Sequence, residues 1–97
     1  MDVSERFGEN LLRIRQARKL SQENLADRAG IHRTQISLLE SGRRQPLLET
    51  VVRLAGALDV PVATLFEGIL WAPAAVGMGQ FLVEDPPELP RLSSGSA

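Results

Sequence analysis

A glycine at position 30 stands between two short helical patterns, and this arrangement constrains the fold more than any other feature of the chain. Ser21 is a favoured N-cap residue, and apolar residues recur at helical spacing over residues 25–29. Gly30 suits the left-handed position that ends a helix, because it has no Cβ. After this turn the helical pattern resumes from Arg33 to Glu40. The stretch therefore predicts two short helices joined by a tight turn.

Three more helical segments flank this pair. Apolar residues at spacings of three and four predict a first helix over about residues 5–18. The same pattern predicts a fourth helix over residues 47–58 and a short fifth helix over residues 62–66. Arg13 of the first helix is expected to be plain surface charge. Residues 1–67 are thus expected to form a compact domain of five short helices with no strand.

After the fifth helix the composition changes. Two apolar runs, residues 69–73 and 80–84, flank a glycine-bearing connection, which is typical of a β-hairpin. The expected fold class is therefore all-α, with five short helices and a C-terminal β-hairpin extension. We divide the chain into a helical domain (residues 1–67), the hairpin (residues 68–84) and a Pro- and Ser-rich tail (residues 85–97), which we expect to be flexible.

Two of the four aromatic residues of the chain, Trp71 and Phe81, lie in the predicted hairpin. A two-stranded hairpin is only marginally stable alone, so it must pack on the helical domain, on a second copy or on a partner protein. Because exposed apolar patches mark interaction sites, we expect Trp71, Phe81, Ile69 and Val83 to supply much of a homodimer contact. The lack of basic flanking residues counts against insertion of the hairpin into a membrane surface.

The net charge is small but unevenly distributed. The whole chain carries −1, yet residues 1–56 hold ten Lys and Arg against seven Asp and Glu, a balance of +3. Residues 57–97 hold one Arg against five acids, a balance of −4. A basic first part and an acidic second part suit a protein that presents one face to phosphates.

Several function classes are not expected. The chain has no cysteine and one histidine, which excludes disulfides and cysteine-based zinc sites, and we expect neither a metal nor another cofactor. Neither a Ser/His/Asp set nor a glycine-rich phosphate loop is present, so we do not expect an enzyme. No apolar run reaches the roughly 18 residues of a membrane span, and the N-terminus lacks a signal pattern. We therefore expect a cytoplasmic protein that does not bind membranes.

The second helix of the central pair has an unusual polar face. It carries Arg33, Thr34, Gln35 and Ser37, and no carboxylate occurs before Glu40. The major groove of DNA admits a helix, and its base edges offer partners to Arg, Gln, Thr and Ser side chains. We therefore predict that this face contacts the bases of double-stranded DNA. The alternative interpretation is an ordinary solvated face.

Residues around this helix are candidates for phosphate contacts. Arg43 and Arg44 follow it in a loop and form a compact cationic edge. Gln22 begins the preceding helix, whose N-terminus favours anions. His32, just before the second helix, could also contact a phosphate, although a weak helix cap is the simpler interpretation.

The segments LSQENLADRAGI, ISLLESGRRQP and ETVVRLAGALDVPVATLF resemble the Cro/phage-repressor family of helix-turn-helix regulators, also called the xenobiotic-response-element family. The resemblance covers about residues 6–67, two thirds of the chain. It implies a helix-turn-helix fold in which the second helix of the pair recognises DNA.

The resemblance also implies roles for individual positions. Similar repressors pair an arginine of the first helix with the acid that ends the recognition helix, and these positions are here Arg15 and Glu40. Gln22 stands at a phosphate-binding position. The base-contacting positions are occupied by Arg33, Thr34, Ser37 and Leu38.

The observations together predict a sequence-specific transcriptional regulator, expected to be a repressor. One small domain contacts few bases, so we expect a homodimer on a palindromic operator. An alternative is an antitoxin or a restriction-modification controller that also binds a partner protein through the hairpin. A further alternative is a protein-interaction module built on the same scaffold.

Overall fold

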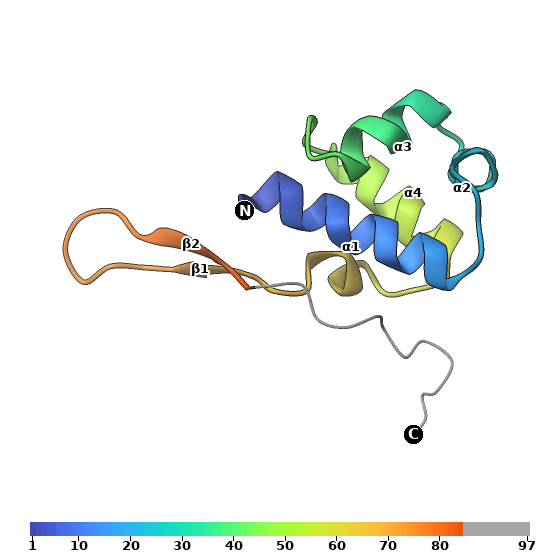
Figure 1. Ribbon diagram of the computed structural model, residues 1–97. Helices are drawn as coiled ribbons and strands as arrows, with labels where there is room; N and C mark the ends of the chain where they lie inside the picture. Colours follow the sequence, from blue (N-terminus) through green and yellow to red (C-terminus); the bar gives the residue numbers. More distant parts are fainter. Residues whose placement is uncertain (85–97) are drawn as a thin grey trace, which may run out of the picture.

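The computed structural model describes residues 1–84, and the predicted tail, residues 85–97, lies outside the described residues. The described part is a cluster of short helices from which a two-stranded hairpin extends (Figure 1). The elements in chain order are α1 (Val3–Ala17), α2 (Gln22–Ala29), α3 (Arg33–Glu40), α4 (Leu48–Leu58), the 3-10 helix η1 (Val62–Phe66), β1 (Ile69–Ala72) and β2 (Gln80–Val83).

The predicted fold class, an all-α helix-turn-helix domain with a hairpin extension, is confirmed. The fifth helix is a single 3-10 segment rather than an α-helix. Helix α1 begins earlier than predicted because Asp2 and Glu5 cap it reciprocally. The Glu5 main-chain N–H donates to Asp2 Oδ1 at 2.8 Å, and the Asp2 N–H donates to Glu5 Oε1 at 2.8 Å. This capping box satisfies two N–H groups at the helix start.

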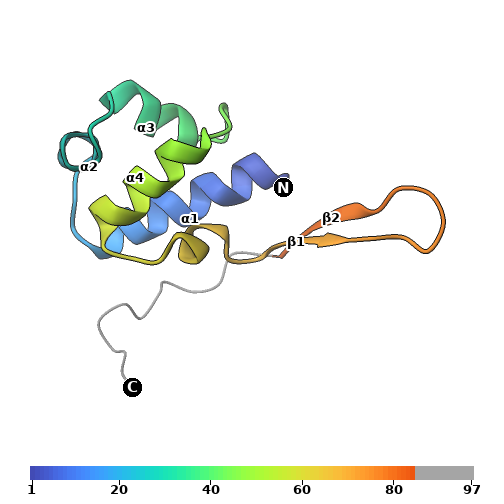
Figure 2. The same ribbon diagram turned by 180° about the vertical axis from the view of Figure 1, so that it is seen from behind.

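Helix α1 is central to the helical cluster. It packs against α3 and η1, while α2 packs against α3 and α4 (Figures 1 and 2). One apolar core joins these helices, and each fully buried side chain contributes roughly 1.5–3 kcal/mol through burial. The largest apolar side chains of this core are Phe7, Leu11, Ile14, Leu25, Ile36, Leu39, Leu54, Leu58 and Leu65.

Two glycines allow the helices to approach and turn. Gly30 ends α2 with a φ of +72°, a left-handed conformation that favours glycine. The next N–H, of Ile31, donates to Ala26 O at 3.1 Å and closes the turn before α3. Gly8 lies where α1 touches the end of α3, and a Cβ there would collide with the carbonyl oxygens of Leu39 and Glu40. The close packing of α1 against α3 therefore depends on Gly8.

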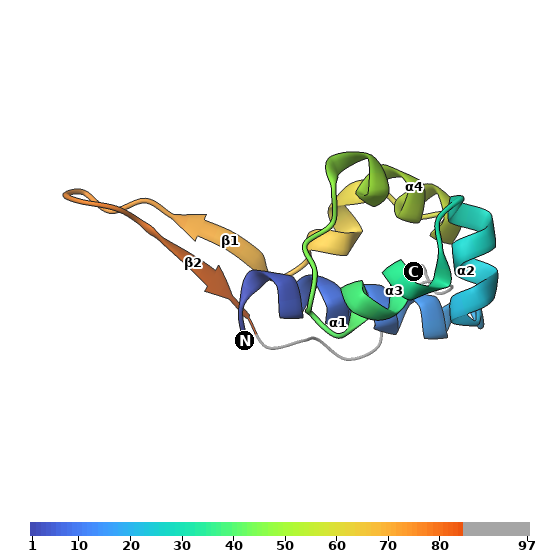
Figure 3. The same cartoon turned by 90° about the horizontal axis from the view of Figure 1, so that it is seen from above.

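The hairpin is antiparallel, and Trp71 is the register partner of Phe81. Its base is closed by the Glu84 N–H, which donates to Gly68 O at 2.9 Å. From this base the hairpin extends away from the helices, beside the N-terminus of α1 (Figure 3). Its connection to the helical cluster therefore lies at one end only.

Buried polar side chains on α1 hold the base of the hairpin in place. Arg6 is 1% exposed and donates from Nε to Glu67 O at 2.9 Å and from Nη1 to Glu84 O at 3.0 Å. Asn10 is also buried, and its Nδ2 donates to the carbonyl oxygens of Leu65 and Glu67. One helix thus holds both ends of the hairpin through hydrogen bonds to main-chain carbonyls.

The expectation that Arg13 is plain surface charge is wrong. Its side chain is 8% exposed, and Nη2 donates to Asn10 Oδ1 at 2.8 Å. Burial lowers the pKa of the Arg13 guanidinium, and the nearby Arg6 cation lowers it further, while Glu67 and Glu9 oppose the shift. The guanidinium remains charged at neutral pH.

Candidate nucleic-acid interface

Helix α3 divides into a buried face and an exposed face. Ile36 and Leu39 are buried in the core and fix the helix on the domain. Arg33, Thr34 and Ser37 lie on the exposed side. The first turn of this helix carries no acidic residue. The exposed face is therefore a row of hydrogen-bonding side chains with one cation.

Two other predicted base-contacting residues, Gln35 and Leu38, are only half-buried. Gln35 lines a shallow hollow of about 70 Å³ together with Arg44 and Thr50. The carbonyl oxygen of Leu38 accepts from the Arg43 N–H at 3.0 Å, so the end of α3 is joined to the following loop. These two side chains lie at the edges of the exposed row rather than in its middle.

The start of α3 is weakly capped. His32 occupies the N-cap position in an extended conformation, and its side chain makes no capping hydrogen bond. The imidazole is exposed beside the first turn of the helix. Within this turn the Gln35 N–H donates to His32 O at 3.0 Å, and the two preceding N–H groups, of Arg33 and Thr34, favour an anionic group.

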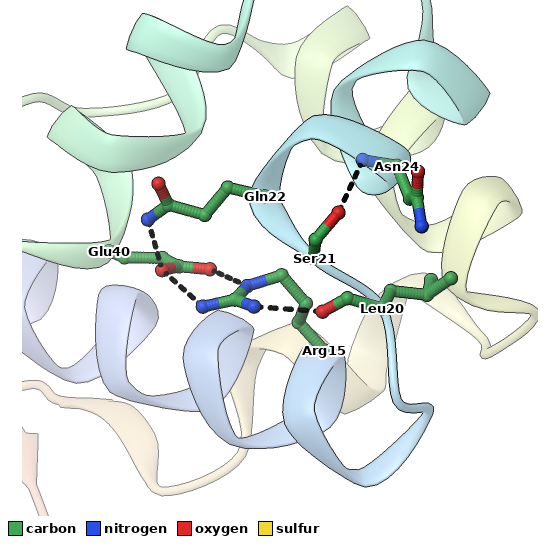
Figure 4. A network of polar contacts seen from close by, with 6 residues as sticks. All are labelled: Arg15, Leu20, Ser21, Gln22, Asn24 and Glu40. Carbon is green, nitrogen blue, oxygen red and sulfur yellow. Dashed lines mark hydrogen bonds and ion pairs between the residues drawn. The ribbon is translucent and has the colours of Figure 1, made fainter.

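An ion pair ties the end of α3 to α1 (Figure 4). Arg15 donates from Nε to Glu40 Oε2 at 2.6 Å and from Nη2 to Glu40 Oε1 at 3.1 Å. The two side chains are 11% and 7% exposed. Arg15 Nη1 also donates to Leu20 O at 2.8 Å, which adds the α1–α2 turn to the network. The carboxylate that ends α3 is thus turned inward, away from the exposed row.

Gln22 joins the same network. Its Nε2 donates to Glu40 Oε1 at 2.9 Å, so the side chain lies over the ion pair (Figure 4). The amide nitrogen carries a second proton, which remains for another acceptor. Ser21, the predicted cap of α2, accepts from the Asn24 N–H at 3.0 Å. The sequence predicted Gln22 as a phosphate-contacting residue but did not predict its hydrogen bond to Glu40.

The loop after α3 presents two cations. Arg43 and Arg44 are both exposed. The loop turns at Gly42, whose φ is +75°, and the Gly42 N–H donates to Leu39 O at 3.1 Å. The cationic loop therefore continues directly from the exposed row of α3.

The four residues predicted to mediate dimerisation fall into two pairs. Ile69 packs against the helical core, and Val83 lines a hollow beside residues 1–4. Trp71 and Phe81 are 50% and 61% exposed, and their rings meet edge to face with centroids 5.0 Å apart. Ile69 is therefore partly covered by the helical core, whereas Trp71 and Phe81 offer apolar surface.

Arg6 and Asn10 are the structural residues that sequence reasoning missed. Residues 6, 10 and 13 lie at helical spacing beside the apolar stripe of α1, a pattern that is equally typical of a solvated polar face.

Neither a candidate metal-binding group nor a candidate membrane-spanning helix occurs among residues 1–84. Among residues 1–84, no group of three or more His, Cys, Asp or Glu side chains could hold a metal ion. In the same part of the chain, none of the helices combines the length and the apolar character needed to cross a membrane.

Comparison with known proteins gives the context of this geometry. The helix-turn-helix family matches residues 11–65, more than half of the chain. The HTH-type transcriptional regulator YqaE of Bacillus subtilis is 39% identical over 62 residues, which are 64% of this chain and 53% of that protein. The chain therefore corresponds to about half the length of that relative.

Controllers of restriction-modification systems are also similar. Control protein C.SmaI of Serratia marcescens is 42% identical over 65 residues, 67% of this chain and 77% of that protein. The crystal structure of the controller C.AhdI from Aeromonas hydrophila superposes with a TM-score of 0.63 at 39% identity, covering 64% of this chain and 94% of that chain. With the central pair of helices, these matches show that the chain belongs to the helix-turn-helix family, as a regulator of the Cro/phage-repressor type.

Proposed function

We propose that this protein is a sequence-specific double-stranded DNA-binding transcriptional regulator that inserts α3 into the major groove. The observation that carries the proposal is the exposed row of Arg33, Thr34 and Ser37 on a helix whose only carboxylate, Glu40, is paired internally. A groove-facing helix must approach negatively charged phosphates closely, so an inward carboxylate removes a source of repulsion.

The side chains of the row suit different base edges. Arg33 can donate two hydrogen bonds to the O6 and N7 atoms of a guanine, the commonest specific contact in the major groove. Thr34 and Ser37 can donate or accept, and the Thr34 methyl group can contact a thymine methyl. Gln35 and Leu38, at the edges of the row, would contact an adenine and a thymine methyl, respectively.

Phosphate contacts would hold this helix in register. Arg43 and Arg44 extend from the loop after α3 and supply two cations. Gln22 has one amide proton left beside its bond to Glu40, and it opens α2, whose N-terminus favours an anion. His32 adds a further donor at the start of α3. Contacts to the backbone carry no sequence information, but they orient the reading helix.

The functional unit would be a homodimer on a palindromic operator, with repression as the expected mode. One α3 helix of 8 residues reaches only a few base pairs, whereas two copies read half-sites about one helical turn apart. The exposed aromatic pair of the hairpin supports this assembly. Because its target is duplex DNA, we expect the protein to act in the cytoplasm.

The experiment is a mobility-shift titration with a palindromic duplex selected from a random pool. Binding should be at least 10³-fold tighter than to a scrambled duplex of equal length, a typical specificity ratio. Affinity for both duplexes should fall steeply with salt, because counterions are released. Equal affinity for the two duplexes, or no shift at low salt, would contradict sequence-specific binding and favour a protein-interaction module.

Restriction-modification control is a second candidate. It is favoured by the similarity to C.SmaI and by the match to 94% of the C.AhdI chain. Nearly all of that controller corresponds to about two thirds of this chain, so most of the remaining third is additional here. A restriction or modification gene beside the coding sequence, with the selected operator upstream of it, would support this role. A toxin gene in that place would instead support an antitoxin that binds a partner through the hairpin.

A further inference from the structure

The hairpin is apolar on both of its faces. Residues 68–83 include no charged side chain. Trp71 and Phe81 point to one face, whereas Leu70 and Leu82, which are 53% and 40% exposed, point to the other. A hairpin that covered only its own domain would need one apolar face. The second face and the open strand edges therefore require another covering surface.

The tip of the hairpin carries the most exposed apolar side chains of the described residues. Val76 is 90% exposed and Met78 is 88% exposed. The base is held by the two hydrogen bonds of Arg6, and the hairpin points away from the helices in each view (Figures 1 and 3). The tip therefore cannot be covered by the domain to which it belongs in this arrangement.

An apolar groove lies beside the base of the hairpin. It has a volume of about 340 Å³ and lies between α1, the start of α4, the end of η1 and β2. Leu48, on its rim, is 83% exposed, and Phe66 is 38% exposed although its ring packs against Phe7 at a centroid distance of 5.5 Å. The other apolar residues that line the groove include Val3, Phe7, Val51 and Phe81.

We propose that a second copy of this chain fills the groove, with the two hairpins antiparallel and the tip of each seated in the groove of the other. This inference rests on the dimer in the proposed function and specifies how that dimer forms. In a two-fold arrangement each contact occurs twice, so tip and groove are covered together. The middle of each hairpin, with Trp71 and Phe81, then lies near the two-fold axis.

The available surface fits a stable dimer. Six large hairpin side chains are between 40% and 90% exposed: Leu70, Trp71, Val76, Met78, Phe81 and Leu82. Trp71 and Phe81 are the aromatic residues among them, and an aromatic side chain can bury about 150–250 Å². A stable interface of standard size buries about 800 Å² per partner, and the groove supplies further area.

The experiment uses cysteine cross-linking, because the natural chain has no cysteine. Two full-length variants, Leu48→Cys and Met78→Cys, are treated with a short bis-maleimide alone and as a mixture. Both positions are more than four-fifths exposed, so neither change should disturb folding. We expect a covalent dimer in the mixture and almost none with either variant alone. The control mixture combines Met78→Cys with Ser37→Cys, an exposed position on α3, and should remain monomeric on a denaturing gel.

Three results would overturn the proposal that the two copies exchange their hairpin tips. Efficient cross-linking of Met78→Cys with itself would mean that the tips meet in a parallel arrangement. The absence of a covalent dimer in the mixture, while sedimentation shows a dimer, would mean that another surface is used. A monomer in sedimentation experiments up to tens of micromolar would mean that no exchange takes place.

A charge placed at the tip provides a second test. Met78→Asp should raise the dimer dissociation constant at least tenfold, because a carboxylate would enter the apolar groove. The matched variant Val62→Asp adds the same charge at an exposed apolar position outside the groove lining and should leave dimerisation unchanged. An unchanged dimer dissociation constant for Met78→Asp would overturn the proposed exchange of hairpin tips. The affinity of Met78→Asp for a duplex with one half-site should also be measured. This measurement tests DNA recognition by α3 without the dimer, so a failure of the hairpin exchange can be distinguished from a failure of DNA binding.

Discussion

At the scale of single residues, Glu40 determines how much positive charge α3 presents. Its carboxylate accepts from Arg15 and Gln22 and is almost fully buried. Arg33 is consequently not neutralised by the acid on its own helix. The same bonds connect α1, α2 and α3 at one point, so the residue combines a structural task with an electrostatic one.

Glu40→Gln should destabilise the domain by about 3 kcal/mol, because it leaves the nearly buried Arg15 cation without its carboxylate. Urea denaturation followed by circular dichroism measures the change in the free energy of unfolding. Glu23→Gln, at an exposed position of α2, is the matched control and should cost less than about 1 kcal/mol. Equal effects of the two changes would show that the Arg15–Glu40 pair has no special role.

Arg43→Gln should weaken binding to every duplex alike and reduce the slope of log affinity against log salt by about 0.9, one phosphate contact. Titrations at four salt concentrations measure the slope. Arg28→Gln removes the same charge from α2, where Arg28 donates to Ala57 O at 2.9 Å, and should leave the slope unchanged. A change in the preferred sequence with Arg43→Gln would instead assign Arg43 to base recognition.

At the scale of elements, helix ends and close helix contacts explain how α3 is held. Gly30 ends α2, and Gly8 lets α1 approach the end of α3. The Arg15–Glu40 pair lies beside this contact. The orientation of α3 therefore depends on a few local features that surround the apolar core.

Two glycine substitutions should have opposite effects on stability. Gly8→Ala should destabilise the domain by about 1–3 kcal/mol, because its Cβ collides with main-chain oxygens of α3. Gly56→Ala, in α4, meets no atom within 4 Å and should stabilise it by up to about 1 kcal/mol through helix propensity. Thermal unfolding of both variants measures the difference. A stable Gly8→Ala protein would show that α1 and α3 can separate without cost.

Arg6→Met should release the base of the hairpin while the helical core remains folded. The change leaves the carbonyl oxygens of Glu67 and Glu84 without their guanidinium donor. Amide hydrogen exchange of Glu84, whose N–H donates to Gly68 O, should accelerate at least tenfold. The amides of α4 serve as the internal control and should keep their rates. Unchanged hydrogen exchange at Glu84 would contradict the assignment of Arg6 as a residue that holds the base of the hairpin.

Local patterns were sufficient to predict α2, α3 and the hairpin. Ser21 and Gly30 mark the ends of α2 through short-range chemistry, which a sequence displays directly. The burial of Arg6 could not be predicted in the same way, because its acceptors lie 61 and 78 residues away. The Gln22–Glu40 bond was missed for the same reason, since it depends on how α2 and α3 pack.

At the scale of the whole molecule, α1 connects two surfaces with different tasks. Through Arg15 it holds α3, and through Arg6 it holds the hairpin. If the hairpins join two copies, the distance between the two α3 helices follows from these contacts. The half-site spacing of the operator would then be a property of the hairpin attachment as well as of the helix-turn-helix unit.

The most direct measurement is a pair of selections from random duplex DNA, one with the natural protein and one with Arg33→Ala. The natural protein should select a palindrome whose half-sites lie about one helical turn apart. Arg33→Ala should lose preference at one symmetric pair of positions, with a cost of about 1–3 kcal/mol per lost contact, and keep the others. Identical selected sequences with the two proteins would contradict the assignment of α3 as the reading helix.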